Sequence, residues 1–258
     1  MELKGRSAIV TGSSSGVGAA TALMLARRGV SVLVNCSRST EAAERVAAQC
    51  REAGSDAFVV SANVGDDADC QRLAQAALDR FGRIDMLVNN AGTTKFVAAR
   101  KLAGLSAQDF HDIYSVNTIG PFQMVRACEE ALRASRGSVV NVSSIAGQEG
   151  AGSSIAYAAS KGALNTLTIS LARVMGPEVR VNAVLPGFIA AEWLQAGLGE
   201  SYEKGVAAYK DTAALADVMS PEDIADAIVW LLSSDKVTGQ LLRVDAGRAV
   251  GRLPGRPA

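Results

Sequence analysis

The chain of 258 residues is 48% hydrophobic and 20% charged, a composition that suits a globular protein with a sizeable core. Its 26 basic residues balance its 26 acidic ones, so no net positive field is available to hold nucleic acid or an anionic membrane surface. We therefore expect a protein with no nucleic-acid partner and no membrane partner.

The start of the chain and the cysteines indicate the compartment. The first ten residues, MELKGRSAIV, lack the long apolar run of a signal peptide, and no later stretch approaches the length that crosses a bilayer. Cys36, Cys50, Cys70 and Cys128 show no C-x-x-C or other metal-like spacing, so we expect buried, reduced thiols and no metal site. A cytoplasmic location is the resulting expectation.

Short runs of β-branched residues alternate with alanine-rich segments of helical spacing along almost the whole chain. The runs predict buried strands over 7–10, 30–35, 57–61, 86–89, 138–142, 179–184 and 241–244. The segments between them predict helices over 16–28, 40–53, 67–80, 106–134, 154–175 and 221–233. Such alternation is typical of an α/β fold of the Rossmann-like, doubly wound type, with about seven parallel strands and helices on both faces.

The alternation also predicts the domain organisation. We find no linker, internal repeat or low-complexity block, so residues 1–250 are expected to form a single domain. Residues 188–219 form an insertion without a predicted strand, and residues 251–258 form a short tail.

Residues 11–18, TGSSSGVG, are compatible with two different sites. The pattern G-x-S-x-G would make Ser14 a nucleophile, whereas three glycines in one turn also suit a loop that lets backbone approach a phosphate. A Ser-His-Asp hydrolase needs a histidine, and the single one, His111, lies in an amphipathic stretch. Because the first strand-to-helix turn of a doubly wound sheet binds dinucleotides, we interpret Ser14 as part of a phosphate cradle.

Tyr157 and Lys161 are four residues apart in a predicted helix, which places them on one face. A free tyrosine, with a pKa of about 10, is a poor proton shuttle at neutral pH. An ammonium about 4 Å away, at an effective dielectric near 20, would lower that pKa by about three units. Ser144, which follows a predicted strand, could hold the same substrate oxygen. Taken alone, the pair fits an ordinary exposed helix face better than a catalytic pair.

Combined, these motifs resemble the short-chain dehydrogenase/reductase family over nearly the whole chain. Residues 11–18 resemble its cofactor loop T-G-x-x-x-G-x-G, and residues 89–92 resemble its N-N-A-G motif. Pro186-Gly187 resembles the P-G turn after its sixth strand. The residues that match its catalytic four are Asn117, Ser144, Tyr157 and Lys161.

The resemblance implies a role for each of these side chains. Tyr157 would be the acid/base, Lys161 would bind the nicotinamide ribose and lower the tyrosine pKa, and Ser144 would orient the substrate carbonyl. Asn117 would hold a water that relays protons, although for an asparagine taken alone a helix cap or bend is the better explanation. The residues expected to bind the cofactor are Gly12, Ser14, Ser15, Gly16, Val17, Gly18, Ser37, Arg38, Asn63, Val64, Asn90, Ala91, Gly92, Tyr157, Lys161, Pro186, Gly187 and Ile189, with a structural role left open for Asn90.

The end of the second predicted strand, Asn35-Cys36-Ser37-Arg38-Ser39, bears on the choice of dinucleotide. A carboxylate there selects NAD, and none is present, whereas Arg38 is placed to meet a 2′-phosphate. One charge-assisted hydrogen bond would favour NADPH roughly ten- to a hundredfold. Two residues depart from the family's pattern. Some relatives have a second basic residue in the glycine loop, where this chain has Ser15, and the family often has aspartate beside the adenine, where this chain has Asn63. We predict NADP(H), with NAD(H) as the alternative.

The insertion is expected to form a flap over the active site, because it follows the P-G turn. Its apolar residues suit an acyl, alicyclic or aromatic ketone; they are Phe188, Trp193, Leu194, Leu198 and Tyr202. By analogy we predict reduction of a 3-oxoacyl thioester or similar ketone. The alternatives are a dehydrogenase of a sugar, steroid or aromatic alcohol or diol, and a dinucleotide-binding sensor or scaffold without turnover.

Partners and departures complete the expectations. An acidic carrier delivering an acyl thioester would need basic residues near the entrance, and the candidates are Arg100, Lys101, Arg126, Arg133 and Arg136. The resemblance also implies a homo-oligomer, a tetramer or dimer, that uses the helices 106–134 and 154–175. Ala191 replaces the threonine that often contacts the nicotinamide carboxamide, and Ala246 replaces a usual glycine.

Overall fold

Seven parallel strands form the predicted sheet, in the order β3-β2-β1-β4-β5-β6-β7. The structure is a computed structural model that describes residues 2–252. The chain leaves β1 in both directions along the sheet, so the switch point lies between β1 and β4, where doubly wound sheets bind ligands. The strands are β1 (Ser7–Val10), β2 (Ser31–Cys36), β3 (Ala57–Ser61), β4 (Met86–Asn89), β5 (Ser138–Val142), β6 (Arg180–Pro186) and β7 (Leu241–Val244).

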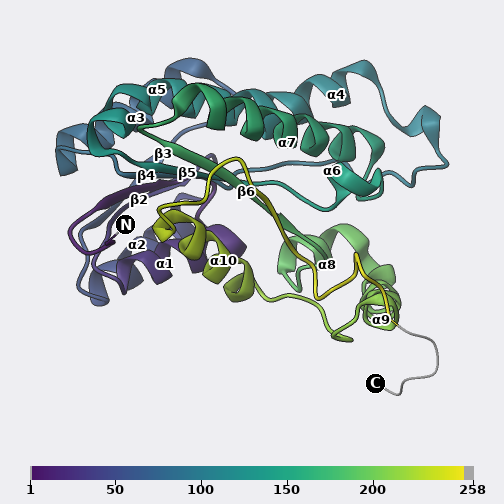
Figure 1. The fold of residues 1–258 in the computed structure, drawn as a ribbon. Coiled ribbons are helices and arrows are strands. Elements are labelled where there is room, and N and C mark those ends of the chain that lie inside the picture. The colour runs from purple at the N-terminus through teal and green to yellow at the C-terminus, as the bar shows by residue number, and fades with distance from the viewer. Residues whose placement is uncertain (1, 253–258) are drawn as a thin grey trace.

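Helices cover both faces of the sheet, with α1, α2 and α10 on one side and α3, α5 and α7 on the other (Figure 1). The helices are α1 (Gly16–Ala26), α2 (Thr40–Glu52), α3 (Asp67–Phe81), α4 (Ala107–Tyr114), α5 (Gly120–Ser135), α6 (Ala146–Glu149), α7 (Ile155–Met175), α8 (Glu192–Leu198), α9 (Tyr202–Thr212) and α10 (Pro221–Ser233). Short 3-10 turns occur at Leu102–Gly104 and Gly199–Ser201.

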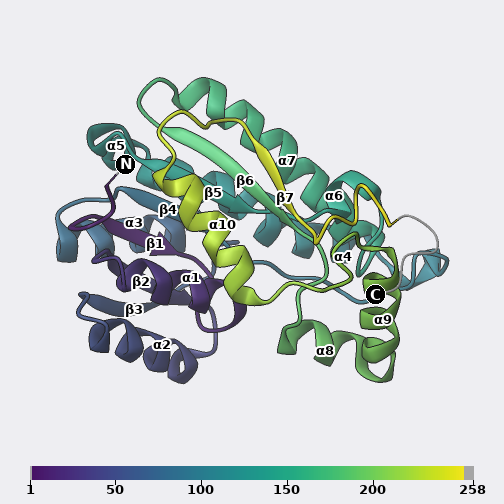
Figure 2. The same cartoon turned by 60° about the horizontal axis from the view of Figure 1, so that its bottom comes forward.

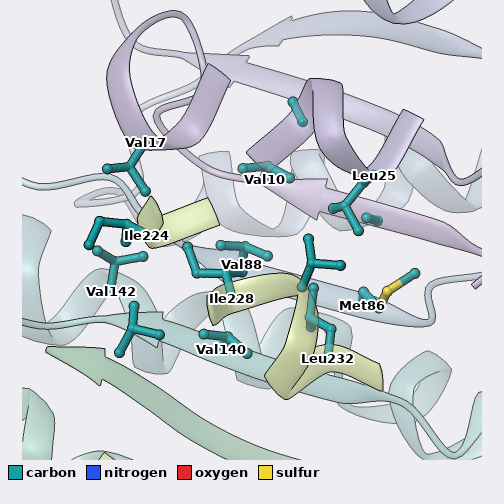
Figure 3. Close-up of a cluster of buried hydrophobic side chains, with 14 of the residues drawn as sticks. Val10, Val17, Leu25, Met86, Val88, Val140, Val142, Ile224, Ile228 and Leu232 are labelled. Carbon is teal, nitrogen blue, oxygen red and sulfur yellow. The ribbon is translucent and has the colours of Figure 1, made fainter. Parts of the chain in front are cut away.

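Two hydrophobic cores hold these layers together, one on each face of the sheet. Figure 3 shows the first, in which Val10, Val88 and Val140 of the central strands meet α1 and α10 side chains such as Leu25 and Ile228. Strands buried on both faces read as continuous apolar runs, which is why their positions could be predicted. The predicted bounds of β1, β3, β4, β5 and β7 are confirmed, β2 lies one residue later, and β6 begins one residue later and ends two later.

The prediction of one helix over 106–134 is wrong. A π-helical turn at Ser115–Ile119 separates α4 from α5. Pro121 has no backbone N–H, so it cannot donate to the carbonyl four residues earlier, and the chain widens there. The irregular turn contains Asn117, one of the predicted site residues.

The predicted insertion contains α8 and α9, which extend beyond the carboxyl edge of the sheet (Figure 2). All four cysteines are buried, as expected, and burial raises the pKa of the Cys70 and Cys128 thiols to about 12. Among residues 2–252, no helix combines the length and apolar character needed to span a bilayer. Most of the predicted tail, residues 253–258, lies outside the described residues.

Candidate active site

The glycine loop follows β1 at the carboxyl edge of the sheet and packs against the turn after β4. A side chain on Gly12 would crowd the backbone of Ala91, and one on Gly18 would collide with the Asn90 amide and the Gly12 carbonyl. Gly12 also has φ 59°, in the left-handed region that favours glycine. The structure therefore brings two predicted cofactor segments, residues 11–18 and 89–92, into direct contact.

Two side chains that were not among the predicted site residues, those of Thr11 and Asn35, hold the glycine loop in place. The Thr11 hydroxyl accepts hydrogen bonds from the backbone N–H groups of Asn90, at 3.0 Å, and Ala91, at 3.1 Å. The buried Asn35 side chain accepts from Gly12 N at 3.0 Å and donates to the carbonyls of Val60 and Ala62. Their polar character inside or next to buried strands is the signal that could have identified them.

The Asn90 side chain serves the loop itself. Its amide donates to the carbonyls of Thr11, at 2.9 Å, and Gly12, at 2.8 Å. The structural role left open for Asn90 is therefore present, and cofactor binding by this residue stays a prediction.

The start of α1 has the properties of an anion site. Ser15 makes no side-chain capping bond, and the first turn of α1 contains no acidic residue, whereas Asp66 and Ser154 cap α3 and α7 with their side chains. The N–H groups of the first turn are thus left for a ligand, and Gly16 has open space around it. Ser14 is partly exposed and Ser15 exposed, while Val17 is buried. These residues fit the pyrophosphate of a dinucleotide.

Ser37 and Arg38 lie exposed directly after β2. No carboxylate among residues 2–252 forms an ion pair with Arg38, so its guanidinium is available to an anion. After β3, the backbone N–H of Asn63 donates to Asp69 and its side chain accepts from Gly65 N, while Val64 is buried. Asn63 therefore shapes its own turn, and its contact with the cofactor stays a prediction.

Tyr157, Lys161 and Ser144 are brought together by α7 and the segment after β5. Lys161 is 3% exposed, its ammonium lies 5.6 Å from the centre of the Tyr157 ring, and it donates to the Val142 carbonyl at 2.8 Å. The Ser144 hydroxyl accepts from Ala146 N at 3.1 Å, and it lies near enough to the Tyr157 phenol to lower the pKa of that phenol. Gly147 lies so close to the backbone of Lys161 that α6, just after Ser144, packs directly on α7. The three predicted catalytic side chains thus form one cluster.

The expected direction of the tyrosine pKa shift is wrong for this arrangement. Burial raises the pKa of Tyr157 to about 12, although the nearby Ser144 hydroxyl acts in the opposite direction. Burial also lowers the pKa of Lys161 to about 8, so this side chain is still mostly an ammonium at neutral pH. The Lys161 ammonium is directed at the Val142 carbonyl, not at a carboxylate.

Asn117 joins this cluster from the π-helical turn. Its side chain accepts from Thr93 N at 2.8 Å and donates to Thr93 O at 2.9 Å and to the Ser160 hydroxyl at 3.0 Å. Gly92 lies between Asn117 and Lys161, since a Cβ there would be 3.5 Å from the Asn117 oxygen and 3.7 Å from the Lys161 nitrogen. The structure therefore places the fourth predicted catalytic residue beside the other three.

The turn after β6 lies at the same edge of the sheet. Pro186 ends the strand, Gly187 N donates to Val244 O at 2.9 Å, and Ile189 pairs with Met219 in an isolated bridge. A side chain on Gly187 would collide with the Tyr209 hydroxyl.

Aromatic contacts connect the insertion to the rest of the site. The ring centres of Phe96 and Trp193 are 5.5 Å apart, and those of Phe188 and Tyr202 are 5.7 Å apart. Phe96, in the loop after β4, was not selected from the sequence, and no local signal marked it. Val97 N of the same loop donates to Ser153 O at 2.8 Å, close to Tyr157 in the chain. The loop therefore bridges from the start of α7 to α8.

Two of the five basic residues proposed for a carrier are already paired. Arg126 forms an ion pair with Asp67, and Arg133 bonds to Glu129 and Glu178. Arg133 and Arg136 lie at the end of α5 that leads into β5, at the amino edge of the sheet and away from the site. For Arg133 and Arg136 the prediction is therefore wrong. Arg100 and Lys101 remain as exposed candidates near α4.

Comparisons with known proteins agree with this geometry. A family profile described as short chain dehydrogenase matches residues 6–200. A Streptomyces violaceoruber protein named as a ketoacyl reductase of the granaticin polyketide synthase is 43% identical over 242 residues, which cover 93% of this chain and 94% of that protein. The 3-oxoacyl-(acyl-carrier-protein) reductase FabG of Staphylococcus aureus is 35% identical over 247 residues, which cover 94% of this chain and 97% of that protein.

Solved structures give the same result. A crystal structure described as a short-chain dehydrogenase/reductase from Burkholderia xenovorans has a TM-score of 0.88 and 40% identity, covering 95% of this chain and 98% of its own. A crystal structure of NAD+-bound xylitol dehydrogenase has a TM-score of 0.85 and 27% identity, covering 96% of this chain and 100% of its own. With the sheet order, the glycine loop and the Ser-Tyr-Lys cluster, these matches show that the chain belongs to the short-chain dehydrogenase/reductase family of oxidoreductases.

Proposed function

We propose that the protein uses NADPH to reduce a 3-oxoacyl thioester, or a similar ketone, to the secondary alcohol. The observation that carries the proposal is the cluster of Ser144, Tyr157 and Lys161 beside the turn after β4. The names of the two relatives, a ketoacyl reductase and a 3-oxoacyl reductase, support the substrate class. A dinucleotide-binding sensor without turnover would not require this cluster.

The tyrosine supplies the proton in this proposal. A bound reduced nicotinamide supplies a hydride to the carbonyl carbon. With its pKa raised to about 12, Tyr157 is a neutral phenol at neutral pH, the form that donates a proton to the carbonyl oxygen. Ser144 would hold the same oxygen through its hydroxyl. Reduction consumes the phenol and leaves a phenolate, which must be protonated again before the next turnover.

Lys161 and Asn117 would prepare the next turnover. Lys161 would bind the nicotinamide ribose and return a proton to Tyr157. Asn117 lies beside Gly92 and Lys161, with its amide committed to Thr93 and Ser160. A water held at this end of the cluster would relay the proton from solvent.

Arg38 supports NADPH over NADH. It is exposed after β2, where the ribose of a dinucleotide lies in this fold, and no carboxylate occupies residues 35–39. The similarity to xylitol dehydrogenase, a structure described as NAD+-bound, favours a second candidate function, the oxidation of a polyol or other alcohol with NAD.

We also propose a cytoplasmic homo-oligomer, a dimer or tetramer, that accepts free or carrier-bound acyl groups. Arg100 and Lys101 are the exposed residues that an acidic carrier could contact.

Nicotinamide absorbance tests the proposal directly. Purified protein, NADPH and a short 3-oxoacyl thioester should give oxidation that is slower with NADH and falls by at least about a hundredfold in Tyr157→Phe. Arg38→Ala should lower the preference for NADPH roughly ten- to a hundredfold. Binding of NADPH without oxidation would reject the thioester and leave the alcohol dehydrogenase, to be assayed with NAD and polyols.

A further inference from the structure

Tyr209, in α9 of the insertion, is buried at a junction of three segments. It is 5% exposed, and its hydroxyl donates to the Asp245 carbonyl at 2.9 Å, in the turn after β7. The same hydroxyl lies against Gly187, where any side chain would collide with it. The Tyr209 ring also lies 5.8 Å from the ring of Phe188. The Tyr209 side chain thus connects α9 to the turns that follow β6 and β7.

The surroundings hold the Tyr209 ring in this position. The Arg248 guanidinium lies 5.0 Å from the ring centre, and Arg248 reaches Glu149 of α6 at 3.6 Å. Glu149 also pairs with Arg243 of β7. Because α6 directly follows Ser144, this chain of contacts runs from the insertion to the catalytic segment.

The insertion has few other bonds to the sheet. Residues 188–190 exchange backbone hydrogen bonds with Met219, which lies within the insertion. Leu215 N donates to Ala246 O at 3.0 Å, and the partly exposed Arg248 donates to the Thr212 hydroxyl of α9 at 3.3 Å. Tyr209 is therefore the buried polar contact that ties the helical part of the insertion to the turn at Gly187.

We propose that Tyr209 is a positioning residue that couples the insertion to the cofactor-binding turn after β6. A dinucleotide that contacts residues 186–189 holds that turn, and the Tyr209 hydroxyl transmits the restraint to α9. Coupling of this kind is reciprocal, so an anchored insertion also tightens dinucleotide binding. The proposal rests on the proposed function in one respect, because it takes the occupant of the site to be a nicotinamide dinucleotide.

The test measures local opening of α9 with and without dinucleotide. Lys204 is exposed in α9, so its cleavage by trypsin, followed by mass spectrometry, reports that opening. NADPH or NADH should slow cleavage of the wild-type protein. In Tyr209→Phe, which removes only the hydroxyl, this protection should fall about three- to tenfold, the size of one hydrogen bond, and the dinucleotide Kd should rise by the same factor.

Tyr202→Phe is the matched control. Tyr202 lies in the same helix and also contacts Phe188, but no hydrogen bond of its hydroxyl is found among residues 2–252, so protection should not change. Arg248→Ala, at a partly exposed position, removes the cation beside the Tyr209 ring and the hydrogen bond to Thr212 of α9, and protection should fall about twofold.

The outcomes separate this inference from the proposed function. If Tyr209 only stabilises the core, Tyr209→Phe will lower the Tm and leave the ratio of cleavage rates unchanged, which overturns the inference. Equal loss in Tyr202→Phe, or no protection of the wild-type insertion by a dinucleotide that binds, also overturns it. The choice of cofactor in the proposed function fails instead if only NADH binds, and in that case NADH serves as the probe.

Discussion

The two sides of the active site are built in different ways. On the cofactor side, the buried side chains of Asn35 and Asn117 and the partly buried side chain of Asn90 connect strand ends through hydrogen bonds, and glycines bring backbone into contact. On the insertion side, partly exposed aromatic rings such as Phe96 and Trp193 make the contacts. Hydrogen bonds are directional and hold the backbone in one geometry, whereas aromatic rings in van der Waals contact can shift relative to one another. The first side suits a constant cofactor, and the second suits a variable substrate.

The largest expected effect tests the cost of burying Lys161 on the cofactor side. Its pKa is lowered from 10.5 to about 8 in the folded protein, so the unfolded chain binds more protons between these values and stability rises with pH there. Relative to Lys161→Met, the free energy of unfolding of the wild type should increase by about 3 kcal/mol from pH 8 to pH 10.5. Urea unfolding at several pH values measures this difference.

An exposed lysine of the insertion provides the control for that experiment. Lys210 pairs with Asp217 at the surface, so Lys210→Met should show no such difference from the wild type across the same pH range. If the free energy of unfolding changes with pH in the same way in the wild type and in Lys161→Met, the buried ammonium is not destabilised. Burial of Lys161 would then not distinguish the cofactor side from the insertion side in stability.

A pair of glycines tests rigidity on each side directly. In Gly18→Ala the new methyl group meets the Gly12 carbonyl and an Asn90 amide held by two bonds, so the loop must shift. Overpacking of this kind costs about 1–3 kcal/mol, and we expect the NADPH Kd to rise about ten- to a hundredfold. In Gly197→Ala the methyl group meets only the ring of Phe96, which can turn away.

Fluorescence titration and steady-state kinetics distinguish these two variants. Gly197→Ala should leave the NADPH Kd within about twofold of the wild type and change the KM of bulky ketones relative to small ones. If both variants weaken NADPH equally, the insertion is as rigid as the glycine loop, and the proposed division of the site is wrong.

The same division explains what could be predicted from the sequence. The strands, the glycine loop and the Tyr157-Lys161 pair follow from local patterns, and most strand bounds were confirmed. The tyrosine pKa was wrong because it depends on burial by distant segments. The contact of Phe96 with Trp193 and the position of Tyr209 depend on tertiary packing, which leaves no periodic signal in the chain.

The smallest expected effect concerns Ala246, next to the backbone bond that ties the insertion to the turn after β7. Ala246 has φ 51°, in the left-handed region that costs a residue with a side chain about 1–2 kcal/mol. Ala246→Gly relieves this strain but gives the unfolded chain more freedom, so the free energy of unfolding should rise by only about 0.5–1 kcal/mol. Ala213→Gly, at a buried position with φ −77°, should instead lower it by about 1 kcal/mol. Urea unfolding of both variants gives the comparison. Destabilisation by Ala246→Gly would show that the methyl group makes packing contacts worth more than the strain, so the turn would resemble the well-packed cofactor side more closely than the insertion.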